Sequence, residues 1–374
     1  MDNSAVLSTG SPLMVCHEIQ LKNFRCFESV AIPFTHPIVL LEGVNGAGKT
    51  SLLEALHYAC YLRSFRTHTP KELVRLGHDH FFVRVKVKTD NNDCEIQVGF
   101  SALKRSVKID QKPINSYKEL MDYYRVVSLI EDDMQIIKGS PQDRRAFIDQ
   151  ILTVLDPSFV AYLREFRKTI SSRNQLIQRA STTDDNYMIW TYQLWEKSQA
   201  IQKKRKELLS HLVHEVNQLI TDYFDDKYKV ICTYQKKLIK DGQSFDVFMQ
   251  RNNTLFSSER DMRHSLFGAH LDDFVIQFEN KSARRLASRG QQKLVVSLLR
   301  IAQARYMINK KGPLLFILDD FITDFDSHAL QQLLSILQKL NSQLILTAPT
   351  LNGTLSSFMQ ASGASVVSLV LGKQ

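Results

Sequence analysis

The sequence predicts an α/β fold in which two strand-containing parts of the chain enclose a helical insertion. Apolar runs typical of buried strands occur early, at residues 38–41, and late, at residues 314–318. Between them lies a long stretch in which apolar residues recur at helical spacing. This order indicates one α/β head, residues 1–135 and 266–374, interrupted by a helical arm, residues 136–265.

Strand patterns dominate the N-terminal third. Residues 81–88 and 94–100 alternate apolar and polar side chains, as half-buried strands do. Asn91, Asn92 and Asp93 between them have the composition of a turn. We therefore expect a β-rich lobe that also contains the run at residues 38–41.

The middle of the chain predicts two long helices. The first follows Asp156 and Pro157, a typical helix start. Its apolar face is formed by Phe159, Tyr162, Leu163, Phe166 and Ile170. The second carries an apolar stripe from Leu194 to Leu219, about three heptads long. Such a stripe is typical of helices packed in a compact bundle rather than of a long coiled coil.

The C-terminal part returns to strand patterns. Residues 314–318 are apolar without interruption and are followed by Asp319 and Asp320. Residues 344–346 form a second such run. Continuously apolar strands are typical of parallel sheets that helices cover on both faces.

Composition excludes several protein classes. The 374 residues are 44% hydrophobic and 23% charged, which is ordinary for a globular protein and unlike a disordered or collagen-like chain. No segment approaches the roughly 20 apolar residues of a membrane-spanning helix, and the N-terminus lacks a secretory signal pattern. The five cysteines have no C-x-x-C spacing, so we expect no zinc site and a reduced, cytoplasmic location. The net charge of +9 favours a polyanionic partner such as nucleic acid or an anionic membrane.

Residues 43–50, Gly-Val-Asn-Gly-Ala-Gly-Lys-Thr, match the phosphate-loop pattern G-x-x-x-x-G-K-[ST] between a predicted strand and a predicted helix. Glycines allow the backbone N–H groups of such a loop to surround phosphates at the positive end of a helix. Lys49 would reach the β- and γ-phosphates, and the Thr50 hydroxyl would bind Mg²⁺. We expect nucleotide contacts from Gly43, Val44, Asn45, Gly46, Ala47, Gly48, Lys49, Thr50 and Ser51.

Two acidic residues end the late buried strand. In a phosphate-loop fold such a strand end brings a carboxylate to the metal, so Asp319 would bind Mg²⁺ and Asp320 would orient the attacking water. Lys49 and Asp319 are 270 residues apart, far more than a small nucleotide kinase requires. We therefore predict Lys49, Asp319 and Asp320 as catalytic groups, with Thr50 and Asp319 as metal ligands.

A third motif lies between these halves. Ser288 and Gly290 open an apolar helical run, and a serine at a helix start leaves N–H groups that bind anions. A serine cap on an ordinary helix has the same pattern.

Together, these motifs resemble the RecF family, within the ABC-type ATPases of chromosome maintenance. Residues 21–25, Leu-Lys-Asn-Phe-Arg, are similar to the opening shared by RecF and SMC-type heads. Residues 64–67, 138–149 and 268–273 resemble blocks of RecF in particular, and residues 288–293 resemble the family's signature motif. The resemblance covers nearly the whole chain in matching order.

The resemblance implies a P-loop ABC-type ATPase head with an inserted helical arm and ATP and Mg²⁺ as cofactors. It implies an ATP-dependent homodimer in which Arg25, Ser288, Gly290 and Gln291 join the nucleotide site, Ser288 from the opposite subunit. It also implies slow, DNA-stimulated ATP hydrolysis and binding of double-stranded, gapped or junction DNA during recombinational repair and replication-fork recovery. RecR, RecO and RecA are the implied partners, and no membrane is involved.

Basic side chains cluster on the predicted arm. Contacts to DNA phosphates give sequence-independent affinity, and the sequence contains no base-reading module. For any single lysine, an ordinary solvated helix face is the alternative. Arg144 and Arg145 remain open between DNA contacts and carboxylate pairs. We predict DNA contacts from Arg164, Arg167, Lys168, Arg173, Lys203 and Lys204.

Three other functions stay open from the motifs themselves. A P-loop kinase would need an acceptor site, and the ATPase subunit of a transporter would need a surface for membrane domains. An ABC-type ATP-binding scaffold without significant turnover is the third; Asp320 and the altered segment at residues 346–349 keep it open.

Overall fold

The computed structural model describes residues 14–88, 93–102, 104–114, 117–179, 184–225, 227–320, 325–349 and 353–369. The chain divides into two compact units, the first formed by Met1–Asp133 with Arg300–Gln374 and the second by Met134–Leu299. Residues 266–299, which we assigned to the head, fall in the second unit. The reason is that β10 (Asp273–Phe278) pairs with β9 (Val230–Gln235) there. Asn91 and Asn92 of the expected turn lie outside the described residues.

In its described part, the first unit contains a five-stranded sheet whose neighbouring strands are all parallel. In spatial order the strands are β14 (Ser365–Ser368), β3 (Ile38–Glu42), β13 (Ser342–Ala348), β12 (Leu314–Leu318) and β8 (Val126–Leu129). All of β12 and β13 is buried, as continuous apolar runs require. Because β13 separates β3 from β12, the carboxyl ends of these three strands meet at one edge.

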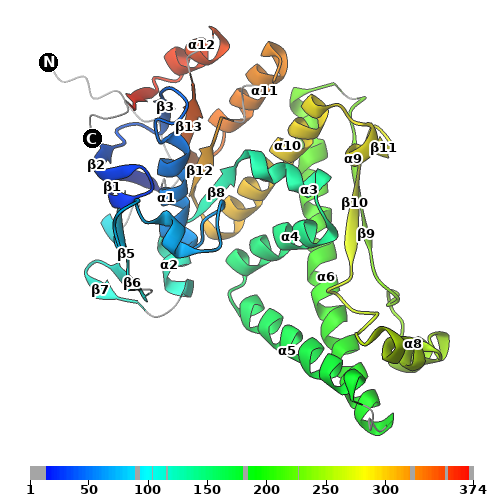
Figure 1. Ribbon diagram of the computed structural model, residues 1–374. Coiled ribbons are helices and arrows are strands. Elements are labelled where there is room, and N and C mark those ends of the chain that lie inside the picture. Colours follow the sequence, from blue (N-terminus) through cyan, green and yellow to red (C-terminus); the bar gives the residue numbers. More distant parts are fainter. Residues whose placement is uncertain are drawn as a thin grey trace, which may run out of the picture. The chain divides into compact units, whose positions relative to one another are not determined.

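Helices of the first unit follow its strands (Figure 1). They are α1 (Lys49–Tyr61), α2 (Tyr117–Tyr123), the second half of α10 (Arg289–Lys311), α11 (Ser327–Gln338) and α12 (Gly353–Ala361), with the short 3₁₀ turns η1 (Pro70–Leu73) and η2 (Glu131–Met134). Nearly every residue of α1 is buried, because it packs against α2 and strands of both sheets. A helix buried on all sides holds its first turn in a fixed position.

A second, antiparallel sheet of the first unit has six strands within the described ranges. They are, in spatial order, β2 (Phe27–Pro33), β1 (Val15–Phe24), β4 (His80–Lys88), β5 (Asp93–Ser101), β6 (Lys104–Ile109) and β7 (Lys112–Pro113). Buried and half-buried residues alternate along β4 and β5, which confirms both predicted strands.

The second unit is mainly helical. Its elements are α3 (Gln135–Lys138), α4 (Pro141–Leu155), α5 (Ser158–Gln178), α6 (Asp184–Tyr223), β9, α7 (Phe245–Arg251), α8 (Leu255–Met262), β10, β11 (Lys281–Ser282), α9 (Ala283–Leu286) and the first half of α10 (Arg289–Lys311). The 40 residues of α6 span about 60 Å. The two predicted arm helices are α5 and α6.

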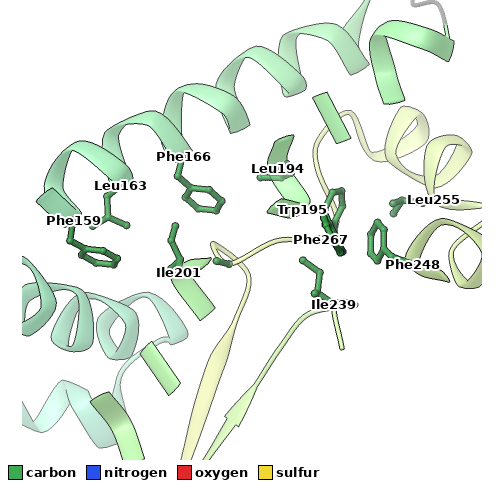
Figure 2. Packing of buried hydrophobic residues seen from close by; sticks show 11 residues of the cluster. Phe159, Leu163, Phe166, Leu194, Trp195, Ile201, Ile239, Phe248, Leu255 and Phe267 are labelled. Carbon is green, nitrogen blue, oxygen red and sulfur yellow. The ribbon is translucent and has the colours of Figure 1, made fainter. Parts of the chain in front are cut away.

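A cluster of aromatic and aliphatic side chains joins these helices. Figure 2 shows Phe159, Leu163 and Phe166 projecting from α5 toward Ile201 of α6. Further along, Trp195 and residues of α7 and α8 close the same cluster. Burying a Phe or Leu side chain contributes roughly 1.5–3 kcal/mol, so this cluster fixes α5 against α6. No helix among the described residues has the length and apolar character needed to cross a membrane.

Candidate functional site

The loop between β3 and α1 has the backbone of a phosphate loop. Gly46 and Gly48 have φ of +87° and +97°, in the left-handed region that favours glycine. A Cβ atom on Gly48 would lie 2.6 Å from the ring of Phe27 and 2.9 Å from Sγ of Cys26. The turn between β1 and β2 therefore packs directly against the loop, and only glycine fits at residue 48.

Lys49 lies over this loop. Its Nζ donates to the carbonyl oxygens of Gly43, at 2.8 Å, and Val44, at 3.4 Å. The same Nζ lies 3.7 Å from Oδ2 of Asp320, and the side chain is 4% exposed. Residues 44–46, by contrast, are exposed, so the rim of the loop is open to solvent. The structure thus places a buried ammonium group directly behind an exposed rim.

The carboxylate after β12 meets the start of α1. The Thr50 hydroxyl donates to Oδ1 of Asp319 at 3.0 Å, although the two residues are 269 positions apart. The N–H of Asp319 donates to the carbonyl oxygen of Leu129 on β8, which fixes the strand end. Burial raises the pKa of Asp319 above its usual range, and hydrogen bonds from the Thr50 and Thr347 hydroxyls oppose that shift.

Thr347, near the end of β13, connects both aspartates. Its hydroxyl lies 3.0 Å from Oδ1 of Asp319 and 3.0 Å from Oδ1 of Asp320, and accepts from the N–H of Asp320 at 2.7 Å. Asp320 has φ of +36°, which is uncommon outside glycine. The Thr347 hydroxyl thus holds a strained residue in place. The sequence did not predict this role for Thr347. The signal that could have indicated it is a hydroxyl residue at the carboxyl end of a run of apolar residues typical of a buried strand.

Arg25 is bound to α1. Its Nε and Nη2 donate to the two carboxylate oxygens of Glu54 at 2.8 and 2.7 Å, and Nη1 donates to the carbonyl oxygen of Glu72 at 2.8 Å. Glu54 is fully buried and also accepts from the Ser64 hydroxyl. Glu54 is the second residue of the site that the sequence did not predict. It ties the turn between β1 and β2, and the segment that follows α1, to the helix that begins at the phosphate loop.

Two further residues of α1 have local roles. His57 of α1 is buried, its Nδ1 lies 3.0 Å from the carbonyl oxygen of Arg63, and burial lowers its pKa to about 4. Ser51 is buried beside Lys49 at the start of the same helix. Within the described residues, no group of three or more His, Cys, Asp or Glu side chains is arranged to hold a metal ion. The oxygens of Thr50 and Asp319 suit Mg²⁺, which prefers a few protein oxygens together with substrate phosphates.

The Ser288 motif, in the second unit, starts α10 with a reciprocal cap. The Ser288 hydroxyl accepts from the N–H of Gln291 at 3.2 Å, and Oε1 of Gln291 accepts from the N–H of Ser288 at 2.9 Å. Ser288 and Gly290 are exposed. The Gln291 side chain is therefore engaged in the cap, while the Ser288 hydroxyl lies at the surface.

Comparison with known proteins decides the family. The family described as an AAA domain matches residues 18–241. A DNA replication and repair protein RecF from Leptospira interrogans is 30% identical over 320 residues, covering 84% of this chain and 86% of that protein. Another, from Agathobacter rectalis, is 30% identical over 350 residues, covering 91% of this chain and 93% of that protein. The chain belongs to the RecF family.

Solved structures agree with the predicted fold. The recombination mediator protein RecF with ATP, in the RecFOR pathway, superimposes with a TM-score of 0.81 at 23% identity and covers 92% of this chain and 94% of that one. An Smc head domain with an extended coiled coil, from Pyrococcus furiosus, gives 0.55 at 14% identity and covers 92% of both chains. The prediction of a P-loop α/β head of the kind found in RecF and SMC proteins, with a helical arm, is confirmed.

Most of the basic side chains predicted to contact DNA are at the surface of this RecF-family protein. Arg164, Arg167 and Lys168 are exposed on α5, and Lys203 is exposed on α6. Lys204 is 47% exposed and donates to Asp156 at 2.9 Å. These positions are open to a large anionic partner.

Arg173 does not fit that prediction, which is wrong for this residue. It is fully buried between the rings of Tyr187 and Phe267, each 4.9 Å from its guanidinium carbon, and it pairs with the fully buried Glu259. The physical reason is helical periodicity, because residue 173 lies seven positions after Phe166 and shares its inward face.

The structure also decides the two arginines left open. Arg144 binds Asp273 through Nε at 2.7 Å and Nη2 at 2.9 Å, and Arg145 donates to the carbonyl oxygen of Asp272 at 2.5 Å. Both contacts lie inside the second unit and connect α4 to the start of β10. Arg144 thus pairs with a carboxylate, as that alternative expected, whereas Arg145 binds a backbone carbonyl oxygen, which neither alternative predicted.

Proposed function

We propose that this RecF-family chain is an ATP-dependent DNA-binding protein of DNA replication and recombinational repair. The contact between Thr50 and Asp319 carries the proposal, because it joins a phosphate loop to an acidic strand end across most of the chain. Relatives 30% identical to it are named DNA replication and repair proteins, and a structure of the same fold was solved with ATP. Both support the proposal.

ATP would bind with its phosphates inside the loop formed by residues 43–50. The backbone N–H groups there are oriented by left-handed glycines, and Lys49 is close enough to exchange its carbonyl contacts for β- and γ-phosphate oxygens. Thr50 and Asp319 would hold Mg²⁺, which neutralises developing phosphate charge when bound. Arg25 would act by positioning α1 rather than by touching ATP, since Glu54 and Glu72 occupy three of its donors.

Slow hydrolysis is the expected activity. Oδ1 of Asp320 shares the one proton of the Thr347 hydroxyl with Oδ1 of Asp319, and Oδ2 of Asp320 lies 3.7 Å from Nζ of Lys49. A carboxylate already engaged at both oxygens is a weak acceptor for the proton of an attacking water. If hydrolysis at this site were negligibly slow, the protein would be a scaffold that binds ATP without significant turnover.

The ATP-bound form would be a homodimer that clamps DNA. The exposed Ser288 and Gly290 support a contact with the nucleotide of a second copy, so that ATP favours the dimer by binding it better than the monomer. The second unit has 26 Lys and Arg residues against 19 Asp and Glu, nearly all of the net positive charge. Duplex, gapped or junction DNA would bind there through Arg164, Arg167, Lys168, Lys203 and Lys204, and RecR, RecO and RecA would be the partners in the cytoplasm.

The test measures the mass of the protein in solution with ATP and with ADP, each with and without gapped duplex DNA. Wild type is compared with Lys49→Ala and with Lys108→Ala, an exposed lysine of the same unit as control. We expect ATP to double the mass and to promote DNA capture in wild type and Lys108→Ala but not in Lys49→Ala. A monomer under every condition, or DNA capture independent of Lys49, would contradict the proposal.

A further inference from the structure

A groove runs along one face of α6 in the second unit. It encloses about 730 Å³ between this helix and the segment that follows β9. The residues that α6 contributes recur every three or four positions, so they share one face of the helix. We call this hollow the α6 groove; polar and charged residues dominate its lining, among them Glu196, Gln199, Lys203, Lys206, Lys236 and Asp241.

Two lysines of the α6 groove hold a carboxylate. Nζ of Lys206 donates to Oδ2 of Asp241 at 2.8 Å, and Nζ of Lys236 donates to Oδ1 of the same side chain. These two contacts lower the pKa of Asp241 to about 2. An ammonium group has three donors, so each lysine can bind a second carboxylate while it keeps the first. The groove therefore already contains a site that suits acidic side chains.

Further donors lie beside the groove without an acceptor. Within the described residues, the buried Nε1 of Trp195 and Nε2 of Gln243 have no hydrogen-bond partner. Trp195 directly precedes the lining residue Glu196, and Gln243 directly follows the lining residue Gly242. Buried donors without acceptors are rare in folded proteins, so a ligand with acceptor oxygens would complete this part of the surface.

An exposed apolar patch continues the same face of α6 toward its N-terminus. Met188, Ile189 and Tyr192 are 39%, 55% and 44% exposed. The Tyr192 ring packs edge-on against Phe245 of α7, with ring centroids 5.1 Å apart, and lies 5.9 Å from the ring of Trp195. We call these three exposed residues the apolar end. Clustered aromatic and aliphatic side chains at a surface are typical of sites that bind another protein.

We propose that the α6 groove and its apolar end bind a short segment of another protein, with an aromatic or large aliphatic side chain about five or six residues from a group of acidic ones. Tyr192 precedes Lys203 by 11 positions and Lys206 by 14, which is about 16–21 Å along a helix. An extended peptide covers that distance in about five or six residues. The apolar side chain would pack on Tyr192, and the acidic ones would bind the lysines. This inference does not depend on the proposed function.

The charges of the groove favour a protein segment over DNA. Glu196 and Glu207 also line it, and neither has an ion-pair partner among the residues that the structure describes. A DNA backbone carries a negative charge at every phosphate, so it would bring some of these charges close to the two carboxylates. A peptide can place acidic side chains at the lysines alone. It can also supply the apolar group that the backbone of DNA lacks.

The probe is a fluorescein-labelled synthetic peptide, Phe-Leu and Asp-Glu-Asp joined by a spacer of about five Gly and Ser residues. Its anisotropy is measured during titration with the full-length protein. One control peptide has Lys-Lys-Lys in place of the acidic residues, and another has Ser-Ser in place of Phe-Leu. We expect the probe to bind at least about tenfold more tightly than either control, because the first control places like charges together and the second lacks the apolar anchor.

Two variants locate the site. Ile189→Ser/Tyr192→Ser should weaken binding of the probe about tenfold, whereas Val160→Ser, which changes an exposed apolar residue of α5, should not. Ile189→Ser alone, at the most exposed of these positions, should weaken it in the same direction in a protein whose packing is unchanged. Asp241→Asn should strengthen binding by about two- to fivefold, because both lysines lose a competing carboxylate. Asp222→Asn removes the same charge from an exposed position of α6 and should have no effect.

Three results would overturn the inference. The first is equal affinity of the protein for the probe and for either control peptide. The second is a probe affinity that neither Ile189→Ser/Tyr192→Ser nor Asp241→Asn changes. The third is an unchanged probe affinity together with weaker binding of gapped duplex DNA in Ile189→Ser/Tyr192→Ser, which would assign the groove to DNA.

Discussion

Replacing Arg173 with methionine should destabilise the second unit strongly without weakening phosphate contacts to DNA. The guanidinium donates to both carboxylate oxygens of Glu259, to the Ser265 hydroxyl at 2.8 Å and to the Thr191 hydroxyl at 3.1 and 3.3 Å. Methionine fills similar space but donates nothing. Glu259 would then keep only the Tyr187 hydroxyl and one backbone N–H as donors.

The expected loss of stability follows from the burial of Arg173 and Glu259. Both partners of the ion pair are fully buried, and removing one partner of such a pair costs about 3–5 kcal/mol. At about 2–4 °C per kcal/mol for a unit of this size, the melting temperature should fall by about 6–20 °C. In Arg173→Met/Glu259→Met no charge remains buried, so most of this loss should be recovered.

Tryptophan fluorescence in a denaturant titration is the suitable assay. Both tryptophans of the chain, Trp190 and Trp195, lie in α6, so the signal reports on the second unit alone. Arg167→Met is the matched control, because Arg167 is exposed on the same helix. It should change stability by less than about 0.5 kcal/mol and instead weaken DNA binding.

Equal stability of the Arg173→Met and Arg167→Met proteins would refute this reasoning. So would a loss of DNA affinity in folded Arg173→Met protein as large as that in Arg167→Met at the same salt concentration. Either result would mean that Arg173 reaches solvent.

Three further predictions concern both units. Thr347→Val should raise the Mg²⁺ concentration needed for tight ADP binding by about 10–100-fold, because residues that orient metal ligands have effects of this size. The affinity for ADP measured in EDTA should not change, and Thr347→Ser should behave as wild type. Burial, and then nearby arginines, lower the pKa of His270 to about 4. In the unfolded chain this histidine has a pKa near 6.5, so between pH 7 and pH 5 it binds a proton that it does not bind in the folded chain. The free energy of unfolding should therefore fall by about 2 kcal/mol from pH 7 to pH 5, as measured by denaturation at both pH values, and this contribution should be absent in His270→Asn. Gly48→Ala should weaken ADP binding more than Gly46→Ala in a fluorescence titration, since both impose left-handed strain of about 1–2 kcal/mol but only the first also clashes with Phe27; equal losses would contradict this explanation.

Local patterns predicted the phosphate loop and its surroundings well. A buried strand, three glycines, Lys49 and a following helix are neighbours in sequence, so their chemistry is set by short-range geometry. The same holds for Asp319 and Asp320, because an apolar run ending in carboxylates specifies a strand and its exit. The strands and the two arm helices, α5 and α6, were predicted for the same reason.

The spacing of Arg173 from Phe166 places it on the inward face of α5, but spacing alone could not show that a charged side chain would be buried there. Arg167 lies outside that face and is exposed, whereas Arg173 is buried where α5 packs against α6 and α8. Long side chains of this kind are buried only when a distant partner such as Glu259 compensates the charge.

The sequence by itself determined the RecF-type α/β head, the phosphate loop and the acidic strand end, because each rests on residues close together in the chain. Tertiary structure alone decided that β13 lies between β3 and β12 and so places Thr347 against both aspartates. It also decided that Glu54 binds Arg25. These contacts join residues tens to hundreds of positions apart, and burial and hydrogen-bond satisfaction across the whole fold select them.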